Sequence, residues 1–186
     1  KHDRLIFLLN NNLKLIYNDI RKFGFIKIDL VNKIKNNPHI MKLGPEPLSN
    51  FFNFKYFKQY LIGRNRSIKN LLMDQKFVSG LGNIYVNEIL FLSKINPKRK
   101  ISKLREADIR NILKNTKSVL KKAIFFGGSS IKDFSHSSGK KGGFQQYFKV
   151  YGRKGSKCSN YNCTGVIKKI ALLNRSSFFC LKCQKY

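Results

Sequence analysis

Acidic residues are scarce in this sequence. Nine Asp and Glu stand against 38 Lys and Arg in 186 residues, which gives a formal net charge of +29 at pH 7. Solubility alone does not need so large an excess, so the composition predicts a polyanionic partner, first of all a nucleic acid. An AT-rich genome would also enrich lysine, but it would leave the scarcity of acids unexplained. The last acid is Asp133, and residues 134–186 carry eleven Lys and Arg, so phosphate contacts are expected there.

Long apolar runs and a signal peptide are also absent. No stretch approaches the roughly 20 apolar residues that a helical membrane span needs. We therefore expect a soluble, cytoplasmic protein that does not bind membranes. The chain begins with Lys1 rather than Met, and a strand-like sequence follows immediately. We therefore expect it to be a piece of a longer protein. Hydrophobic residues make up 42% of it, which is enough for a modest core.

Proline is rare, and three of the four prolines fall within residues 38–47. Before them, RLIFLL, the polar turn NNN, LKLIY and FGFIKID are typical of β-structure, and after them the apolar spacing becomes helical. Ser49 and Ser67 are suited to cap helices. A long helix is expected over residues 109–124, ended by Gly127 and Gly128. The stretch FQQYFKVY at 144–151 predicts a strand.

Four cysteines form two close pairs. Cys158 and Cys163 are separated by four residues, Cys180 and Cys183 by two, and sixteen residues lie between the pairs. Two short knuckles that each deliver two thiolates are typical of a structural Zn²⁺ site. Two disulfides are the alternative, disfavoured because no secretory signal is present. Four sulfur ligands leave no position for a catalytic water, so one structural zinc ion is expected.

Two further stretches point to a phosphate partner. In VSGLGNIYVNE, Gly80 and Gly82 allow a tight turn and a close approach of the main chain to an anion, and Asn83 opens the next helix, whose N-terminal N–H groups favour negative charge. Read alone, Asn83 is an ordinary helix cap. Between the cysteine pairs, GVIKKI and SSFFCL predict a hairpin whose turn carries Asn174 and Arg175, so that Arg175 is held out at the tip.

Taken together, MDQKFVSGLGNIYVNEILF, FFGGSSIKDF, FQQYFKVYGRKGSKC and FFCLKCQ resemble the bacterial formamidopyrimidine-DNA glycosylase family, base-excision repair enzymes for oxidised purines. The resemblance covers essentially the whole chain. It implies an α+β fold: the C-terminal part of a β-sandwich domain (1–37), a linker (38–48), a mainly helical helix–two-turn–helix domain (49–150) and a β-hairpin zinc finger (151–186). The implied partner is duplex DNA with oxidised bases or abasic sites, bound by a monomer.

The resemblance also implies residue roles. DIRKFG at 19–24 matches the family's D-P-R-R-F-G, so that Arg21 would pair with the orphaned cytosine and Phe23 would wedge between base pairs. Without the resemblance, Phe23 would be assigned to the core of a strand. Lys69 would lie near the damaged base and its phosphates, although alone it is interpreted as a solvated helix lysine. Lys132, in the loop SSIKDFSHSSGKKGG, would contact the everted purine. The remaining DNA contacts implied are Gly82, Asn83 and Arg175.

The family's nucleophile is an N-terminal proline, followed by a glutamate and assisted by a lysine of the same domain, and no residue of this chain matches them. The complete enzyme would be a glycosylase and AP lyase, whereas these 186 residues alone are expected to bind damaged DNA and to cut nothing. Three alternatives remain: a non-catalytic zinc-finger DNA-binding module, a zinc-bearing RNA-binding protein, and the sister enzyme for oxidised pyrimidines. The Arg21-x-Phe23 pair and the long loop favour the purine type over the last.

Overall fold

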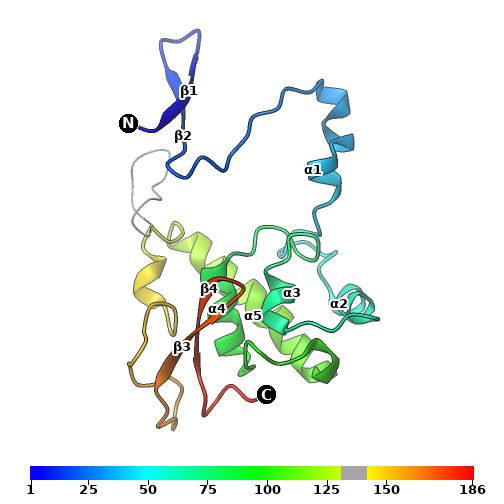
Figure 1. The fold of residues 1–186 in the computed structure, drawn as a ribbon, viewed down its shortest axis with the longest axis vertical. Coiled ribbons are helices and arrows are strands. Elements are labelled where there is room, and N and C mark those ends of the chain that lie inside the picture. Colours follow the sequence, from blue (N-terminus) through cyan, green and yellow to red (C-terminus); the bar gives the residue numbers. More distant parts are fainter. Residues whose placement is uncertain (131–141) are drawn as a thin grey trace. The chain divides into compact units, whose positions relative to one another are not determined.

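The computed structural model describes residues 1–130 and 142–186, and it divides into two compact units, Lys1–Met41 and Lys42–Tyr186. Helices and two-stranded sheets both occur, as an α+β fold requires (Figure 1). The division between the units falls inside the proline-rich stretch 38–48. Every helix among the described residues is too short or too polar to cross a lipid bilayer.

The first unit contains an antiparallel hairpin of β1 (Asp3–Leu8) and β2 (Lys14–Asn18), in which Ile6 lies opposite Ile16. The polar turn predicted at 10–12 joins the strands. A short 3₁₀ helix, η1 (Val31–Asn36), and the single turn α1 (Pro38–Met41) follow. No residue of this unit is buried.

The prediction of β-structure for FGFIKID is wrong, because residues 19–30 form no strand. The reason is local. The side chain of Asp19 accepts hydrogen bonds from the backbone N–H groups of Arg21, Lys22 and Gly24, each at 2.9 Å. These donors are thereby satisfied within a loop and are not offered to a neighbouring strand.

The second unit begins with α2 (Phe54–Leu61) and α3 (Ile68–Leu72). Ser67 caps α3 as predicted, since its Oγ accepts from the N–H of Asn70 at 3.3 Å. Ser49 does not cap α2. That role belongs to Asn53, whose side chain accepts from the N–H of Tyr56 at 3.0 Å, because the helix starts four residues later than the apolar spacing suggested.

Two longer helices, α4 (Asn83–Leu92) and α5 (Glu106–Phe125), pack against each other, with the 3₁₀ turn η2 (Ile101–Lys103) between them in sequence. The predicted end of α5 is confirmed. Gly127 and Gly128 both have positive φ, and their N–H groups return to the carbonyls of Ile124 and Ala123. This is the Schellman arrangement, which a residue with a Cβ adopts only at a cost.

The core of the second unit lies among α2, α3, α4 and α5. An aromatic cluster centred on Phe77 fills one end of it. Aromatic rings at these separations bury large areas and pack edge-on or offset. The cluster consists of Phe52, Tyr56, Phe57, Tyr60 and Phe77.

The C-terminal part contains the hairpin of β3 (Ile167–Leu172) and β4 (Arg175–Cys180), as predicted. Leu173 and Asn174 both have φ near +50° and form the two-residue turn, the geometry that matches strand twist in tight hairpins. The turn thus lies one residue earlier than predicted, and Arg175 is the first residue of β4. The strand predicted at FQQYFKVY is wrong: residues Phe144–Tyr147 form the 3₁₀ helix η3, closed by the N–H of Gln146 on the carbonyl of Gly143.

Candidate nucleic-acid interface and metal site

The turn before α4 is built by Gly80 and by the side chain of Gln75. Gly80 has φ of +78°, a conformation that favours glycine, and its N–H donates to Gln75 Oε1 at 2.7 Å. Gln75 Nε2 donates to the carbonyl of Leu81 at 2.9 Å, so one amide side chain braces both sides of the turn. Gly82 is extended, and a Cβ built on it would meet no atom within 4 Å. The start of α4 therefore stands open to a ligand.

Gly82, and not Asn83, is the N-cap of α4. Asn83 is the first helical residue, and its side chain is used elsewhere: Nδ2 donates to the backbone carbonyl of Ser176 on β4 at 3.0 Å. One turn later, Asn87 Oδ1 accepts from the N–H of Phe178 at 2.7 Å. The first half of α4 is thus fastened along β4 by two asparagines on one helix face.

Lys69 is the residue whose surroundings differ most from the expectation. It is 1% exposed, and its Nζ donates to Ser177 Oγ at 2.5 Å and to the carbonyl of Ser176 at 3.2 Å. Burial lowers the pKa of its ammonium group from 10.5 to about 8, and the nearby positive charge of Arg175 acts in the same direction. The interpretation of Lys69 as a solvated lysine is wrong.

Lys69 of α3 and Asn83 of α4 both donate to the carbonyl of Ser176 on β4, the residue after Arg175. Arg175 is exposed at the first position of β4, directly after the hairpin turn. A cleft of about 280 Å³ opens between α3 and this turn. Its one acid, Asp74, is paired with Arg66 at 2.8 Å, so the cleft keeps its positive character. The lining residues are Lys69, Asn70, Met73, Asp74, Leu172, Leu173 and Arg175.

Arg21 and Phe23 lie in the first unit, on the loop that Asp19 organises. Phe23 is 86% exposed and contributes nothing to a core. Hydrogen bonds to the backbone, above all from the N–H of Gly24, hold the pKa of Asp19 below its usual value, so the carboxylate stays charged. A Cβ at Gly24 would overlap the hydroxyl of Tyr17, so a larger residue there would displace the Tyr17 side chain. The loop presents an arginine and an unsupported aromatic ring to the outside.

Lys132 lies outside the described residues, but both flanks of that segment are described. Ser129 and Gly143 form an isolated antiparallel bridge. The side chain of Gln145 accepts from the N–H of Ser130 at 3.2 Å and donates to the carbonyl of Gly142 at 2.6 Å. The two ends of the segment are therefore held together by a residue that sequence reasoning did not single out.

Glu88 is a second residue without a predicted role. Glu88 lies on α4, and its buried carboxylate accepts hydrogen bonds from the backbone N–H groups of Lys149, Val150 and Tyr151 at 2.8 to 3.0 Å. Burial raises its pKa, and the three donors oppose that shift. A single acid at an apolar position of the helical pattern was the signal available in the sequence. Glu88 thus joins α4 to the segment that leads into the cysteine knuckles.

The four cysteine sulfur atoms lie within 4.8 Å of one another, and the thiols are free. The Sγ atoms of Cys158 and Cys183 are 3.5 Å apart and those of Cys163 and Cys180 are 3.7 Å apart. Disulfide sulfurs would be about 2.05 Å apart. A tetrahedron of sulfurs around a metal with bonds of about 2.3 Å has edges of about 3.8 Å, so the cluster fits a metal ion. Gly165 is needed here, because a Cβ would approach Cys180 Sγ to 2.5 Å.

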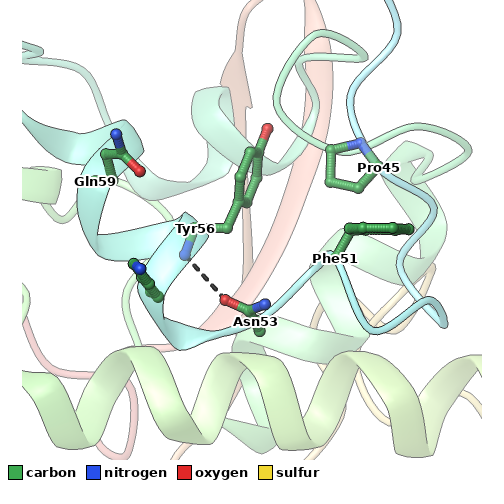
Figure 2. A pocket seen from close by; sticks show the side chains of 6 residues that line it. Pro45, Phe51, Asn53, Tyr56 and Gln59 are labelled. Carbon is green, nitrogen blue, oxygen red and sulfur yellow. Dashed lines mark hydrogen bonds between the residues drawn. The ribbon is translucent and has the colours of Figure 1, made fainter.

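A separate hollow of about 360 Å³ lies beside α2 (Figure 2). Its lining includes Asn53, whose side chain is already engaged in capping α2. No predicted site residue borders it, and we assign it no role. The lining residues are Pro45, Phe51, Asn53, Lys55, Tyr56 and Gln59.

Comparison with known proteins gives this arrangement a family. The profile described as Formamidopyrimidine-DNA glycosylase H2TH domain matches residues 43–135, half of the chain. The chain belongs to the formamidopyrimidine-DNA glycosylase family. Curated members include a protein of Roseobacter denitrificans, 43% identical over 187 residues, and one of Rickettsia canadensis, 42% identical over 184 residues. The match covers 100% and 99% of this chain, respectively, and 65% and 66% of those relatives.

Solved structures agree. The crystal structure of MutM (Fpg) from Thermus thermophilus superposes with a TM-score of 0.88 at 34% identity, covering 98% of this chain and 68% of the other. A Lactococcus lactis Fpg variant in complex with DNA containing Fapy-dG has a TM-score of 0.90 at 38% identity, covering 100% and 67%. The fold is therefore that of the formamidopyrimidine-DNA glycosylases. This chain spans about two thirds of the length of its curated relatives.

Proposed function

We propose that this chain forms the DNA-binding part of a base-excision repair glycosylase with AP lyase activity, which removes oxidised purines such as 8-oxoguanine and formamidopyrimidines from duplex DNA. The relatives named above are formamidopyrimidine-DNA glycosylases, and two of the solved Lactococcus lactis Fpg complexes contain Fapy-dG DNA or abasic-site DNA. We assign DNA binding, and no bond cleavage, to the residues of this chain. Such an enzyme would act in the cytoplasm, where the bacterial chromosome lies.

The observation that carries the proposal is that two nitrogen-bearing side chains from different helices meet on β4 directly beside Arg175. Lys69 and Asn83 both donate to the carbonyl of Ser176, and Arg175 is the neighbouring residue. Beside them the open start of α4 offers N–H groups and the positive end of the helix dipole. A phosphate group binds favourably to cationic side chains, to a helix N-terminus and to a glycine that leaves the backbone accessible.

The cysteine cluster is proposed to hold one Zn²⁺ with a structural role. Four thiolates suit zinc and leave no coordination position for a water molecule. The ion would join the two knuckles that flank β3 and β4, and it would thereby fix Arg175 at the hairpin tip. The domain limits 1–37, 38–48, 49–150 and 151–186 belong to the same proposal.

The exposed pair in the first unit completes the proposed contacts. Phe23 would fill the space of an extruded nucleotide and Arg21 would pair with the base opposite it, since a guanidinium group suits the acceptors of cytosine. Lys132 would contact the extruded purine. These roles are supported by the exposure of Phe23 and by the match of residues 19–24 to the family pattern.

Binding to a duplex with a central abasic analogue, measured against an intact duplex of the same sequence, tests the proposal on the zinc-loaded chain. We expect tighter binding to the abasic duplex, because it exposes the gap that Phe23 and Arg21 would fill. Equal affinity for the two duplexes would contradict the proposal. A preference for RNA of matched length would favour the RNA-binding alternative instead.

The salt dependence of the same measurement tests Arg175. Each phosphate contact contributes about 0.9 to the slope of log affinity against log salt concentration on duplex DNA. Arg175→Ala is therefore expected to reduce the slope by about one unit. Arg110→Ala, which removes an exposed arginine of α5 outside residues 134–186, is the matched control. An unchanged slope in Arg175→Ala would exclude a phosphate contact at this residue.

A further inference from the structure

The first cysteine knuckle is longer than the second, and the structure shows what its extra residues do. Four residues separate Cys158 from Cys163, whereas two separate Cys180 from Cys183. The carbonyl of Asn160 accepts from the N–H of Cys163 at 3.1 Å, which closes the longer knuckle into a turn. The side chain of Asn160 then reaches out of this turn, and its Nδ2 donates to Cys183 Sγ at 3.1 Å.

This hydrogen bond crosses between the two knuckles. Asn160 belongs to the first knuckle and Cys183 to the second, 23 residues later in the chain. Within the described residues, Asn160 provides the one side-chain N–H donor to any of the four sulfur atoms. Asn160 therefore links the first knuckle to a sulfur atom of the second.

Such donors matter because of charge. Four thiolates around Zn²⁺ leave a net charge of about −2 in a partly buried site, and thiolates are the form that binds the metal. An N–H group directed at a thiolate offsets some of that charge and fixes the direction of the sulfur lone pairs. Residues that orient metal ligands in this way usually change affinity by about 10–100-fold when they are replaced.

We propose that Asn160 is a positioning residue for the metal site, which holds Cys183 in the orientation required for zinc and compensates for the lengthened first knuckle. The inference rests on the zinc site of the proposed function. It goes beyond that site by assigning a role to a residue that ligates nothing. The neighbouring Tyr161 shares the same turn but is 94% exposed, so it has no comparable role.

The test is zinc affinity of the full chain, measured by competition with a chromophoric chelator at fixed pH. Asn160→Ala is expected to bind zinc about 10–100-fold more weakly than the unmodified chain. Asn160→Asp is expected to lose at least as much, because it sets a carboxylate without a donor against a thiolate. Tyr161→Ala, in the same turn, is the matched control and should keep the original affinity.

A second readout reports on the ligand itself. With Co²⁺ in place of zinc, the thiolate-to-metal absorption band is expected to shift in Asn160→Ala and to stay in place in Tyr161→Ala. Unchanged zinc affinity in Asn160→Ala would overturn the proposal, and so would an equal loss in both variants, which would indicate a general effect on the turn. If Cys183→Ser binds zinc as well as the unmodified chain does, the zinc site itself fails, and that result is distinct from the other two.

Discussion

Lys69 holds its charge in a place where lysine is rarely found. Its ammonium group is buried against β4, satisfied by one hydroxyl and one carbonyl oxygen, and among the described residues no carboxylate is a hydrogen-bond partner of it. An ammonium group in such surroundings loses its proton more readily than one in water. The charge that the cleft offers to a phosphate therefore depends on pH near neutrality.

We predict that DNA binding weakens as the pH rises through about 8, the pKa to which burial lowers Lys69. Lys69→Met should bind DNA more weakly at pH 7 and should lose this pH dependence, and NMR of ¹³Cε-labelled lysine would follow the titration directly. The effect of pH on the stability of the fold has the opposite sign to its effect on DNA affinity. Between pH 8 and 10.5 the folded chain holds fewer protons at this residue than the unfolded chain, so the free energy of unfolding should rise with pH.

A Lys69 resonance that titrates above pH 10 would contradict this prediction. So would a binding curve for Lys69→Met with the same pH dependence as that of the unmodified chain. Arg175, at the first position of β4, is the positive group whose charge acts on Lys69.

Residues whose chemistry is local could be predicted from the sequence, and residues whose partners are distant could not. Ser67 caps the helix that directly follows it, and the cysteine spacing alone indicates a metal site. The partner of Lys69 is 108 residues away and that of Asn160 is 23 residues away, so their roles appear only when the chain is folded. Phe23 shows the reverse case, because only the family resemblance indicated that it would be exposed.

At the scale of elements, α4 is the helix to which the other parts of the second unit are bound. Asn83 and Asn87 fasten it to β4, and Glu88 fastens it to residues 149–151. Its other side is buried in the core against α5. The helix that begins at the proposed phosphate-binding turn thus also fixes the position of the hairpin that carries Arg175.

Glu88→Ala is predicted to destabilise the chain strongly. It leaves three backbone N–H groups in a buried place without their acceptor, which should cost about 3 kcal/mol, or a fall in Tm of roughly 6–12 °C for a domain of this size. Thermal unfolding followed by circular dichroism measures it. Glu106→Ala is the control, because its ion pair with Lys58 is exposed and should contribute little to stability. Similar losses in the two variants would show that the three hydrogen bonds contribute little.

Two of the errors in the predicted elements have a similar origin. Asn53 replaced Ser49 as the cap of α2, and Asp19 took up the N–H of Gly24 at the start of FGFIKID. Polar side chains that bond to nearby backbone compete with regular structure, and periodicity of apolar residues does not reveal which of them succeeds. The long helix α5 and the hairpin β3–β4 were predictable because their patterns extend over many residues.

At the scale of the whole molecule, the two units differ in how much they can support themselves. The second unit has an extensive core, whereas the first has no buried residue. Its hairpin exposes aliphatic and aromatic side chains, among them Ile6, Phe7, Leu15 and Ile16. A two-stranded hairpin alone is at best marginally stable in water.

A chain of residues 42–186 is therefore predicted to fold by itself. Its Tm should lie within about 2 °C of that of the full chain, since the cooperative core is retained. Calorimetry and zinc content would measure this. The shortened chain should still bind intact duplex DNA through Lys69 and Arg175, but it should lose the preference for an abasic duplex, which Arg21 and Phe23 would provide. Loss of the folded state would show that the first unit contributes to the core.

The two-residue turn at Leu173 and Asn174 also sets the register in which β3 and β4 pair. Side chains alternate between the faces of a hairpin, and the pairing of Leu172 with Arg175 sets which face each residue of β4 occupies. One inserted residue at the tip would send Ser177 to the opposite face and deprive Lys69 of its acceptor. Changes in length should consequently be excluded at the tip, whereas substitutions that preserve the two-residue turn should be tolerated there.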